Sequence, residues 1–259
     1  MEIKQTAETK SEKKEAPIQS VARALEILQC FYEADELRLG EISKKLNLNK
    51  STAYGLIRTM ETYGFLAQST DTGKYRLGMS LFRLANNIDS SLRTLARTSL
   101  GSLVHEFGET ANLSVRVGDY NMYLEKLESP FSVRICTSPG EMFPLYLTAM
   151  GKCILSYLPD EEISGILSRV HYVQYTPNSL MSDEDVMRDL EQIRRNGFSI
   201  DNEERELGLT CVAVPVFDRH NEVIAALSVS GPSQRMPREK INTIQLTLRN
   251  EARNIQMRL

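Results

Sequence analysis

Long apolar stretches and targeting signals are absent from this sequence of 259 residues. It has no run of about 18 apolar residues, so it predicts no membrane-spanning helix. The N-terminal segment MEIKQTAETKSEKKEAP carries charges but no apolar stretch, which excludes a signal peptide. Its Lys- and Glu-rich composition predicts a disordered tail over residues 1–17.

Cysteine and histidine are also scarce. The four cysteines and three histidines are widely spaced, without a CxxC pair, an HExxH motif or a Cys/His cluster. Cysteines spaced in this way, without a signal peptide, are typical of reduced thiols, and we expect a cytoplasmic protein. The pattern predicts no metal site and no cofactor. The cysteines are Cys30, Cys136, Cys153 and Cys211.

Motifs of common enzymes are missing as well. There is no GxSxG and no GxGxxG, and the GK at positions 151–152 is not a P-loop, because that motif would need a glycine at Tyr146. Cys153 or Cys211 with a distant histidine is the one conceivable nucleophile, and no local signature supports it. We therefore predict no catalytic residue and no enzyme.

The charge is unevenly distributed. The net charge is −3 overall, +1 over residues 18–78 and −4 over residues 79–259. Between Glu41 and Glu61 every charged residue is basic. A basic window inside a mildly acidic protein is a local electrostatic feature of the kind that DNA-binding surfaces carry.

Helix signals fill the segment around this window. Ser20 can cap a helix that reads VARALEILQCFYE, and Gly40 can cap a short helix that reads EISKKL. Asn47 tolerates the positive φ of a tight turn, and Asn49 can cap the next helix. Gly64 ends that helix. Two helices joined by so short a turn predict a helix-turn-helix.

The third helix, in NKSTAYGLIRTM, has two different faces. Ala53, Leu56, Ile57 and Met60 form its apolar stripe, and the opposite stripe is polar or small and holds no acid. The following segment, FLAQSTDTGKYRLG, predicts two short strands around a turn. Three helices and a hairpin over residues 18–78 make a winged helix-turn-helix.

A winged helix-turn-helix places its second motif helix in the major groove of DNA, and the wing on the backbone or in the minor groove. The alternative is a protein–protein module with solvated basic residues. The predicted DNA-binding residues are Lys50, Ser51, Thr52, Tyr54, Arg58, Lys74, Tyr75 and Arg76.

The rest of the chain predicts a second domain. Leucine spacing from Met79 onward indicates a helix, either packed in a core or forming a linker over residues 79–95 with a dimer seam. Residues 96–259 then alternate helices and strands in a pattern that favours an antiparallel sheet with attached helices. Strands are expected over residues 112–119, 122–129, 132–138, 208–218 and 222–231. Helices are expected near 95–107, 148–158, 159–168, 182–196 and 236–257.

Two features of this domain suggest a polar pocket. A Gly/Pro-containing loop leads into a helix near Thr148, and free N–H groups at a helix start can bind an anion. Ser228 and Ser230 share one face of a strand, and Cys211 and Ala213 share one face of another. The alternatives are an ordinary core helix and serines bonded to backbone.

The sequence motifs of both domains resemble those of the IclR family of bacterial transcriptional regulators. The similarity covers residues 18–259. It rests on IQSVARALEILQCF, LGEISKKLNLNKSTAYGLIRTMETYGFL and YRLG, then on PLYLTAMGKCILSYL, RRNGFSIDNEERELGLTCVAVPVFD and AALSVSGP.

The resemblance implies a two-domain α/β architecture, with a winged helix-turn-helix, a linker helix and a C-terminal GAF-like effector domain. It also implies homodimers or dimers of dimers on palindromic double-stranded operators, and small organic or aromatic acids as effectors. The effector-binding positions that it implies are the Ala149 and Met150 backbone N–H groups, Asp201, Cys211, Ser228 and Ser230.

Some residues depart from the family pattern. Asn47 stands where relatives often have Gly, and Gly40 stands where they often have Ser or Thr. Tyr146 and Met150 are bulky, so the effector's size does not transfer. An ionised Asp201 would repel a carboxylate, so it must be protonated, bond a ligand hydroxyl or be held by other groups.

The sequence therefore predicts a DNA-binding regulator whose operator affinity changes with an effector, through unequal binding to two arrangements of a dimer. Two alternatives stay open. One is a ligand-independent DNA-binding protein whose second domain only oligomerises. The other is an enzyme with an appended DNA-binding domain.

Overall fold

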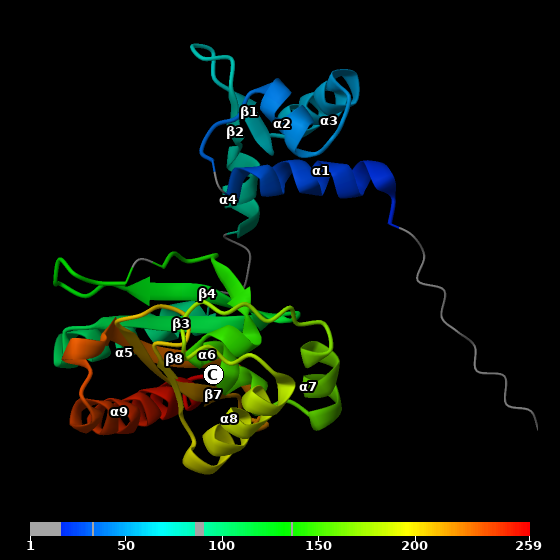
Figure 1. Cartoon of the computed structure of the whole chain (residues 1–259). Helices are drawn as coiled ribbons and strands as arrows, with labels where there is room; N and C mark the ends of the chain where they lie inside the picture. The colour runs from blue at the N-terminus through cyan, green and yellow to red at the C-terminus, as the bar shows by residue number, and fades with distance from the viewer. Residues whose placement is uncertain (1–16, 33, 86–90, 136) are drawn as a thin grey trace, which may run out of the picture. The chain divides into compact units, whose positions relative to one another are not determined.

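The computed structural model describes residues 17–32, 34–85, 91–135 and 137–259 (Figure 1). The chain divides into two compact units, Met1–Asp89 and Ser90–Leu259. Apart from residue 17, the predicted disordered tail lies outside the described residues. Among the helices in the described ranges, none is long and apolar enough to cross a membrane.

The N-terminal unit is a winged helix-turn-helix, as predicted (Figure 1). Its helices are α1 (Gln19–Gln29), α2 (Leu39–Lys45) and α3 (Lys50–Thr62), with the single turn η1 (Cys30–Tyr32) after α1. Strands β1 (Leu66–Gln68) and β2 (Tyr75–Leu77) form the antiparallel wing hairpin. Apolar side chains from all these elements close one core, among them Ile27, Phe31, Ile42, Ile57, Leu66 and Tyr75.

The turn between α2 and α3 follows the sequence signals. Asn47 has φ of 49°, the left-handed conformation predicted for it. The Asn49 side chain caps α3 by accepting the Thr52 N–H at 2.8 Å. Gly64, just after the helix, has φ of 73°. These three residues fix the direction in which α3 leaves the turn.

Two of the predicted helix caps are wrong. Helix α1 begins at Gln19 because the Ala22 N–H already bonds the Ile18 carbonyl, so Ser20 lies inside the helix. Arg38, and not Gly40, precedes α2. There the Glu41 carboxylate accepts the Arg38 backbone N–H at 2.6 Å and fixes an earlier start.

The segment predicted as a linker helix is helical on both sides of residues 86–90, which lie outside the described residues. Helix α4 (Met79–Ala85) belongs to the N-terminal unit, and α5 (Ser91–Phe107) to the C-terminal unit. The linker role of this segment stays a prediction.

The C-terminal unit is built on a six-stranded antiparallel sheet with the order β5-β4-β3-β8-β7-β6. Helices α5 and α9 pack on one face of this sheet, and α6, α7 and α8 on the other (Figure 1). The strands are β3 (Thr110–Val117), β4 (Tyr120–Leu127), β5 (Met142–Pro144), β6 (Ser199–Asn202), β7 (Leu209–Phe217) and β8 (Val223–Pro232). The helices after α5 are α6 (Ala149–Leu155), α7 (Asp160–Leu167), α8 (Asp183–Asn196) and α9 (Arg238–Gln256), with the single turns η2 (Leu145–Leu147) and η3 (Ser233–Arg235).

The strand predictions hold except at two places. The strand expected over residues 132–138 is wrong, since the described residues of that segment form none. The free edge of β4 is taken instead by β5, which pairs Met142 with Met122. Strand β6 was not predicted as a strand, although it pairs with β7 and carries Asp201.

Candidate functional site

Helix α3 turns its apolar stripe inward and its polar stripe outward. Ala53, Ile57 and Met60 are buried in the unit's core. Lys50, Ser51, Tyr54 and Arg58 are exposed, and Thr52 is half-buried. The predicted reading residues of this helix therefore lie on its solvent side, which is where contact with a DNA groove requires them.

Arg58 has an acidic neighbour that the sequence analysis did not consider. Its Nη1 lies 2.7 Å from the Glu61 carboxylate, one turn along α3. Because the Arg58 side chain is 56% exposed, this pair is weakly held, and a phosphate or guanine can replace Glu61.

Two of the three wing residues that were predicted to contact DNA have accessible side chains. Lys74 is half-buried and Arg76 is exposed. Tyr75 is only 3% exposed, and its backbone N–H and carbonyl both pair with Leu37. Its inclusion among the DNA-binding side chains was wrong, because strand alternation turns Tyr75 into the core between two outward basic residues.

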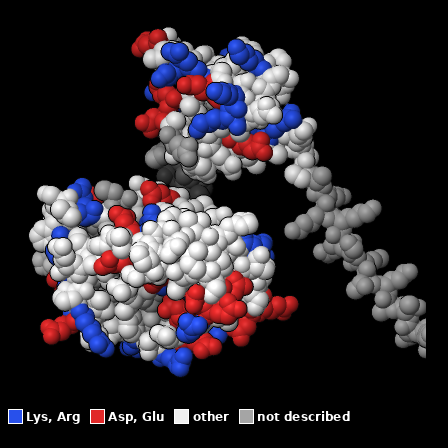
Figure 2. Space-filling model, viewed as in Figure 1, with Lys and Arg blue, Asp and Glu red and all other residues white. Residues whose placement is uncertain are grey.

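The two units carry charge differently on their surfaces. Figure 2 shows Lys and Arg side chains mixed with Asp and Glu side chains on the N-terminal unit, and Asp and Glu side chains crowded over α7 and α8 of the C-terminal unit. The first turns of those two helices hold Asp160, Glu161, Glu162, Asp183, Glu184 and Asp185. The main acidic patch in this view therefore belongs to the C-terminal unit.

Strand register assembles the second site on the sheet face below α6. Asp201 of β6 is opposite Cys211 of β7, and Cys211 is opposite Ser230 of β8. On the next rung, Ser228 of β8 is opposite Asn112 of β3. Because these residues share one face of the sheet, their side chains line one small pocket together with Ala149 and Met150 at the start of α6.

All six predicted effector-binding residues thus meet in a single pocket. That they bind an effector stays a prediction. The structure adds lining residues that sequence reasoning missed, and these are Asn112, Tyr123, Ile135, Thr137, Thr148, Arg205 and Leu209. A motif search has little chance of finding Asn112, because only strand pairing brings it to Ser228, 116 residues away along the chain.

Asn112 organises the polar wall of the pocket. Its Nδ2 donates to Ser228 Oγ at 3.2 Å and to Ser230 Oγ at 3.5 Å. Its Oδ1 is buried and has no donor among the described residues, as is also true of Thr137 Oγ1. A buried acceptor without a partner is costly, so this wall is suited to a ligand hydroxyl.

Arg205 is the one cation that lines the pocket. Its guanidinium carbon lies 3.9 Å from the centre of the Phe143 ring, a cation–π contact. It has no carboxylate partner among the described salt bridges. Arg205 therefore supplies the positive charge that a carboxylate ligand needs.

The pocket is almost filled. Its free volume is about 10 Å³, room for one water molecule. A larger cleft of about 310 Å³ adjoins it, and Ile135, Thr137, Arg205 and Leu209 line both. Arg205 therefore lies at the boundary between the cleft and the pocket.

Burial changes the protonation of the pocket residues. It raises the pKa of the Asp201 carboxyl, against the opposing effects of Lys152 and of the Glu204 backbone N–H that Asp201 accepts at 2.9 Å. A protonated Asp201 is one of the three possibilities that the sequence left open. Burial likewise raises the pKa of the Cys211 and Cys153 thiols, so both stay protonated. A thiol without thiolate character is a poor nucleophile.

A buried lysine anchors strand β6, which carries Asp201, and the turn after it, which carries Arg205. The Lys152 ammonium group, on α6, is fully buried and lies 2.7 Å from the Glu204 carboxylate and 2.8 Å from that of Asp189 on α8. It also donates to the Ile200 carbonyl at 2.9 Å. Burial lowers the pKa of Lys152, but the two carboxylates outweigh burial and raise it. Lys152 therefore stays charged and ties α6, α8 and this turn together.

Among the described residues, no three His, Cys, Asp or Glu side chains gather in a way that could hold a metal ion. The pocket's donors are hydroxyl, amide, thiol, carboxyl and guanidinium groups, which suit a small polar organic ligand.

The fold and the pocket together define a DNA-binding protein whose second domain contains a polar pocket. Comparison with known proteins gives the class. Residues 87–257 match the family model described as "Bacterial transcriptional regulator IclR C-terminal", and residues 20–70 match the "IclR helix-turn-helix domain". The chain belongs to the IclR family of transcriptional regulators, with a helix-turn-helix DNA-binding domain and a C-terminal effector domain.

Relatives cover nearly the whole chain. It is 38% identical over 222 residues to the HTH-type transcriptional regulator XynR of Escherichia coli, covering 85% of this chain and 88% of that protein. It is 36% identical over 242 residues to KdgR of the same species, covering 92% and 91%. These relatives are transcriptional regulators.

Solved structures agree on the fold. An IclR homologue from Microbacterium hydrocarbonoxydans, crystallised with 4-hydroxybenzoate, has a TM-score of 0.84 at 26% identity, covering 93% of this chain and 98% of that one. An IclR regulator from Alicyclobacillus acidocaldarius has a TM-score of 0.83 at 29% identity, covering 94% and 99%.

Proposed function

We propose that this regulator senses a small organic acid that also carries a hydroxyl group, and that binding of this acid changes its affinity for operator DNA. The observation that supports this most is that one pocket is lined both by a cation, Arg205, and by Asn112, whose buried Oδ1 acceptor has no partner among the described residues. Arg205 would bind the acid's carboxylate, and Asn112 would accept its hydroxyl hydrogen. The first N–H groups of α6, at Ala149 and Met150, would assist the carboxylate.

The acid must open the pocket in order to enter. A free volume of about 10 Å³ admits no organic acid, so the ligand would enlarge the pocket into the adjoining cleft by displacing Arg205 and its turn. A ligand that binds only the opened arrangement shifts the protein toward that arrangement. The difference between the ligand's binding free energies for the two arrangements is what can change the affinity for DNA.

The small volume equally favours a second candidate, a DNA-binding protein whose C-terminal domain only oligomerises. A thermal-shift screen of small acids, starting with 4-hydroxybenzoate, separates the two. A true effector at a hundred times its Kd stabilises the domain by about 2.7 kcal/mol, a rise of roughly 5–10 °C. Ser228→Ala should reduce that rise. If no acid stabilises the wild type, the ligand-independent candidate is preferred.

The DNA-binding surface is proposed to consist of Lys50, Ser51, Thr52, Tyr54 and Arg58 on α3, with Lys74 and Arg76 on the wing. Residues of α3 would read base edges, and the wing would contact the DNA backbone. The protonated thiols of the buried Cys153 and the half-buried Cys211 support a role without catalysis, and the proposed location is the cytoplasm.

The proposed assembly on a palindromic operator is a homodimer or a dimer of dimers. Apolar side chains that a lone domain would leave in water support this: Ile18 is 72% exposed, Leu25 is 56%, Met79 is 71% and Phe82 is 60%. A groove of about 390 Å³ beside α1, lined by Val21, Leu25 and Met60 among others, continues this surface. One winged-helix unit buries too little DNA surface for tight binding, so two must act together.

A further inference from the structure

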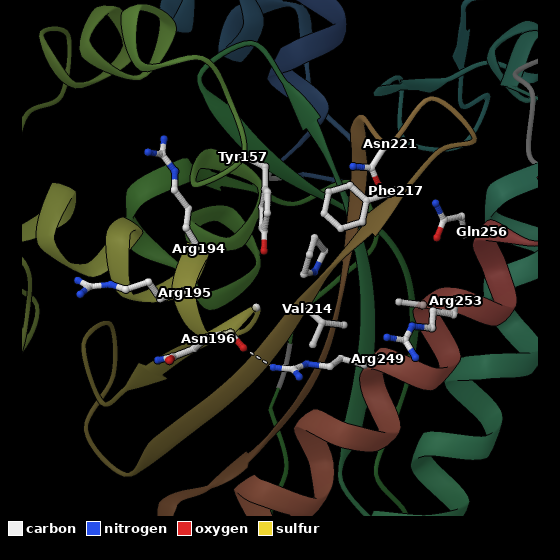
Figure 3. Close-up of a pocket in the computed structure, with 13 residues that line it drawn as sticks. Tyr157, Arg194, Arg195, Asn196, Val214, Phe217, Asn221, Arg249, Arg253 and Gln256 are labelled. Carbon is white, nitrogen blue, oxygen red and sulfur yellow. Dashed lines mark hydrogen bonds between the residues drawn. The ribbon is translucent and has the colours of Figure 1, made fainter.

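A second cavity of the C-terminal unit, larger than the proposed effector pocket, has no assigned role. It has a volume of about 410 Å³ and lies between α8, α9 and the end of β7 (Figure 3). It shares no lining residue with the effector pocket. We call it the arginine groove, because Arg194, Arg195, Arg249 and Arg253 all line it and no Asp or Glu does.

The two arginines of α8 are already engaged. Arg194 donates to the Ser156 carbonyl and, at 2.7 Å, to the Asp160 carboxylate. Arg195 lies 3.5 Å from the Glu191 carboxylate. In Figure 3 both side chains extend away from the groove. Their charges are therefore largely balanced outside it.

The two arginines of α9 are not balanced in this way. Arg249 donates through Nη2 to the Asn196 carbonyl, while its Nε is buried and has no acceptor among the described residues. Arg253 is exposed and has no carboxylate partner among the described salt bridges. In Figure 3 the Arg249 guanidinium extends toward Asn196, and the Arg253 guanidinium lies beside α9. Because Arg253 has no carboxylate partner among the described salt bridges, an oxyanion in the groove can balance its charge.

Two carboxylates close to these arginines along the chain or beside the groove have other partners. The Asp218 carboxylate, on the turn beside the groove, accepts the backbone N–H groups of His220 and Glu222 at 2.8 Å and 2.9 Å. The Glu251 carboxylate, on α9, accepts from Asn254 at 3.4 Å. Neither side chain lines the groove, so the charge of Arg249 and Arg253 remains available to a ligand.

The opposite wall is largely apolar. The rings of Tyr157 and Phe217 meet edge to face with centroids 5.1 Å apart, and Val214 and Pro215 lie beside them. Burial raises the pKa of the Tyr157 phenol, so at neutral pH it remains a hydroxyl that can donate a hydrogen bond. This wall suits an apolar group, such as a ring, attached to the anion.

We propose that the arginine groove is a second ligand site that binds a small organic oxyanion, with its phosphate or carboxylate held by Arg249 and Arg253 and its apolar group packed against Tyr157 and Phe217. This site is independent of the effector pocket. The groove's volume of about 410 Å³ lies in the range of roughly 300–1,000 Å³ that is typical of small-molecule sites.

Isothermal titration of the full-length protein with phenyl phosphate tests the site, with inorganic phosphate as the arm that lacks the ring. We expect saturable one-to-one binding of phenyl phosphate, and weaker binding of inorganic phosphate. Arg253→Gln removes an exposed side chain and should weaken phenyl phosphate by about 10-fold or more, the usual effect of losing a charge-assisted hydrogen bond. Its thermal unfolding should match that of the wild type.

Two arginine variants serve as matched controls. Arg188→Ala removes an exposed arginine of α8 outside the groove, and Arg205→Ala removes the cation of the effector pocket. Both should keep the affinity within about twofold. The proposal is overturned if phenyl phosphate does not bind saturably at millimolar concentration. It is equally overturned if Arg205→Ala, and not Arg253→Gln, abolishes the binding.

Discussion

Single side chains decide what the effector pocket can recognise. The sequence motifs led to Asp201, Cys211, Ser228 and Ser230, and strand register brings these four residues together. Those motifs alone describe a pocket that is polar but has no cation. Arg205 supplies the cation, and it escaped prediction because it lies in a charge-rich run, NEERE, that is typical of a solvated loop. The Lys152–Glu204 ion pair is what turns this run inward.

Arg205→Ala should discriminate an acid from its neutral analogue. For the hydroxy acid that the thermal-shift screen identifies, we expect the acid to bind at least about tenfold more weakly to the variant, because a charge-assisted hydrogen bond is lost. The matching amide of that acid should lose little. Titration calorimetry with both compounds measures the contrast, and Arg188→Ala is the control. Equal losses for acid and amide would remove Arg205 from the role of counter-ion.

Among the proposed DNA-reading residues, Arg58 has the clearest expected effect. Arg58→Ala should lower operator affinity by about 1–3 kcal/mol if Arg58 contacts a guanine, with relaxed specificity at that base. A fluorescence anisotropy titration at fixed salt measures it, with Arg188→Ala as the control outside the DNA-binding unit. Unchanged affinity in Arg58→Ala would exclude this residue from base reading.

At the scale of elements, local signals predicted the helices well and the sheet edges poorly. Asn47, Asn49 and Gly64 set the turn and both ends of α3 by local chemistry, which a sequence carries openly. Strands β5 and β6 lie at the two edges of the sheet, and whether they form depends on pairing with strands from distant parts of the chain. A short segment of sequence does not encode that pairing. Helix α6 touches the effector pocket at its start, and Tyr157, just beyond its end, lines the arginine groove.

The Asn49 cap should contribute measurably to the stability of the N-terminal unit. Asn49→Ala removes the acceptor of the Thr52 N–H, and we expect a loss of about 1 kcal/mol in the free energy of unfolding. Asn49→Ser keeps a capping oxygen and should lose much less. Urea denaturation of both variants checks this, and an equal loss in the two would show that the cap is not the cause.

For the whole molecule, the proposed binding to a palindromic operator requires more than one copy of the chain. The exposed apolar side chains of α1 and α4 lie in the DNA-binding unit, where the two half-sites of a palindrome would bring two copies together. The family resemblance implies such a dimer, and the exposed apolar side chains of α1 and α4 form the surface that we propose for it. The apolar spacing of the sequence alone left core packing and a dimer seam equally open.

Leu25→Glu should therefore shift the protein toward monomers, because a charge would be buried in the interface. Sedimentation velocity measures the assembly. Leu246→Glu, on α9, is the matched control, since Leu246 is 55% exposed and Leu25 is 56%. A wild-type protein that is monomeric at all concentrations, or a Leu25→Glu variant that assembles normally, would contradict the proposed dimer surface.

We propose that one molecule couples effector binding to operator binding. An operator titration tests this coupling, using a palindromic sequence enriched from random double-stranded DNA, with and without the acid that the thermal-shift screen identifies. We expect saturating acid to change the operator Kd by about 5- to 150-fold, and the operator to change the acid's Kd by the same factor. Arg205→Ala should remove both changes. An operator Kd that stays the same with the acid bound would show that the two sites are not coupled.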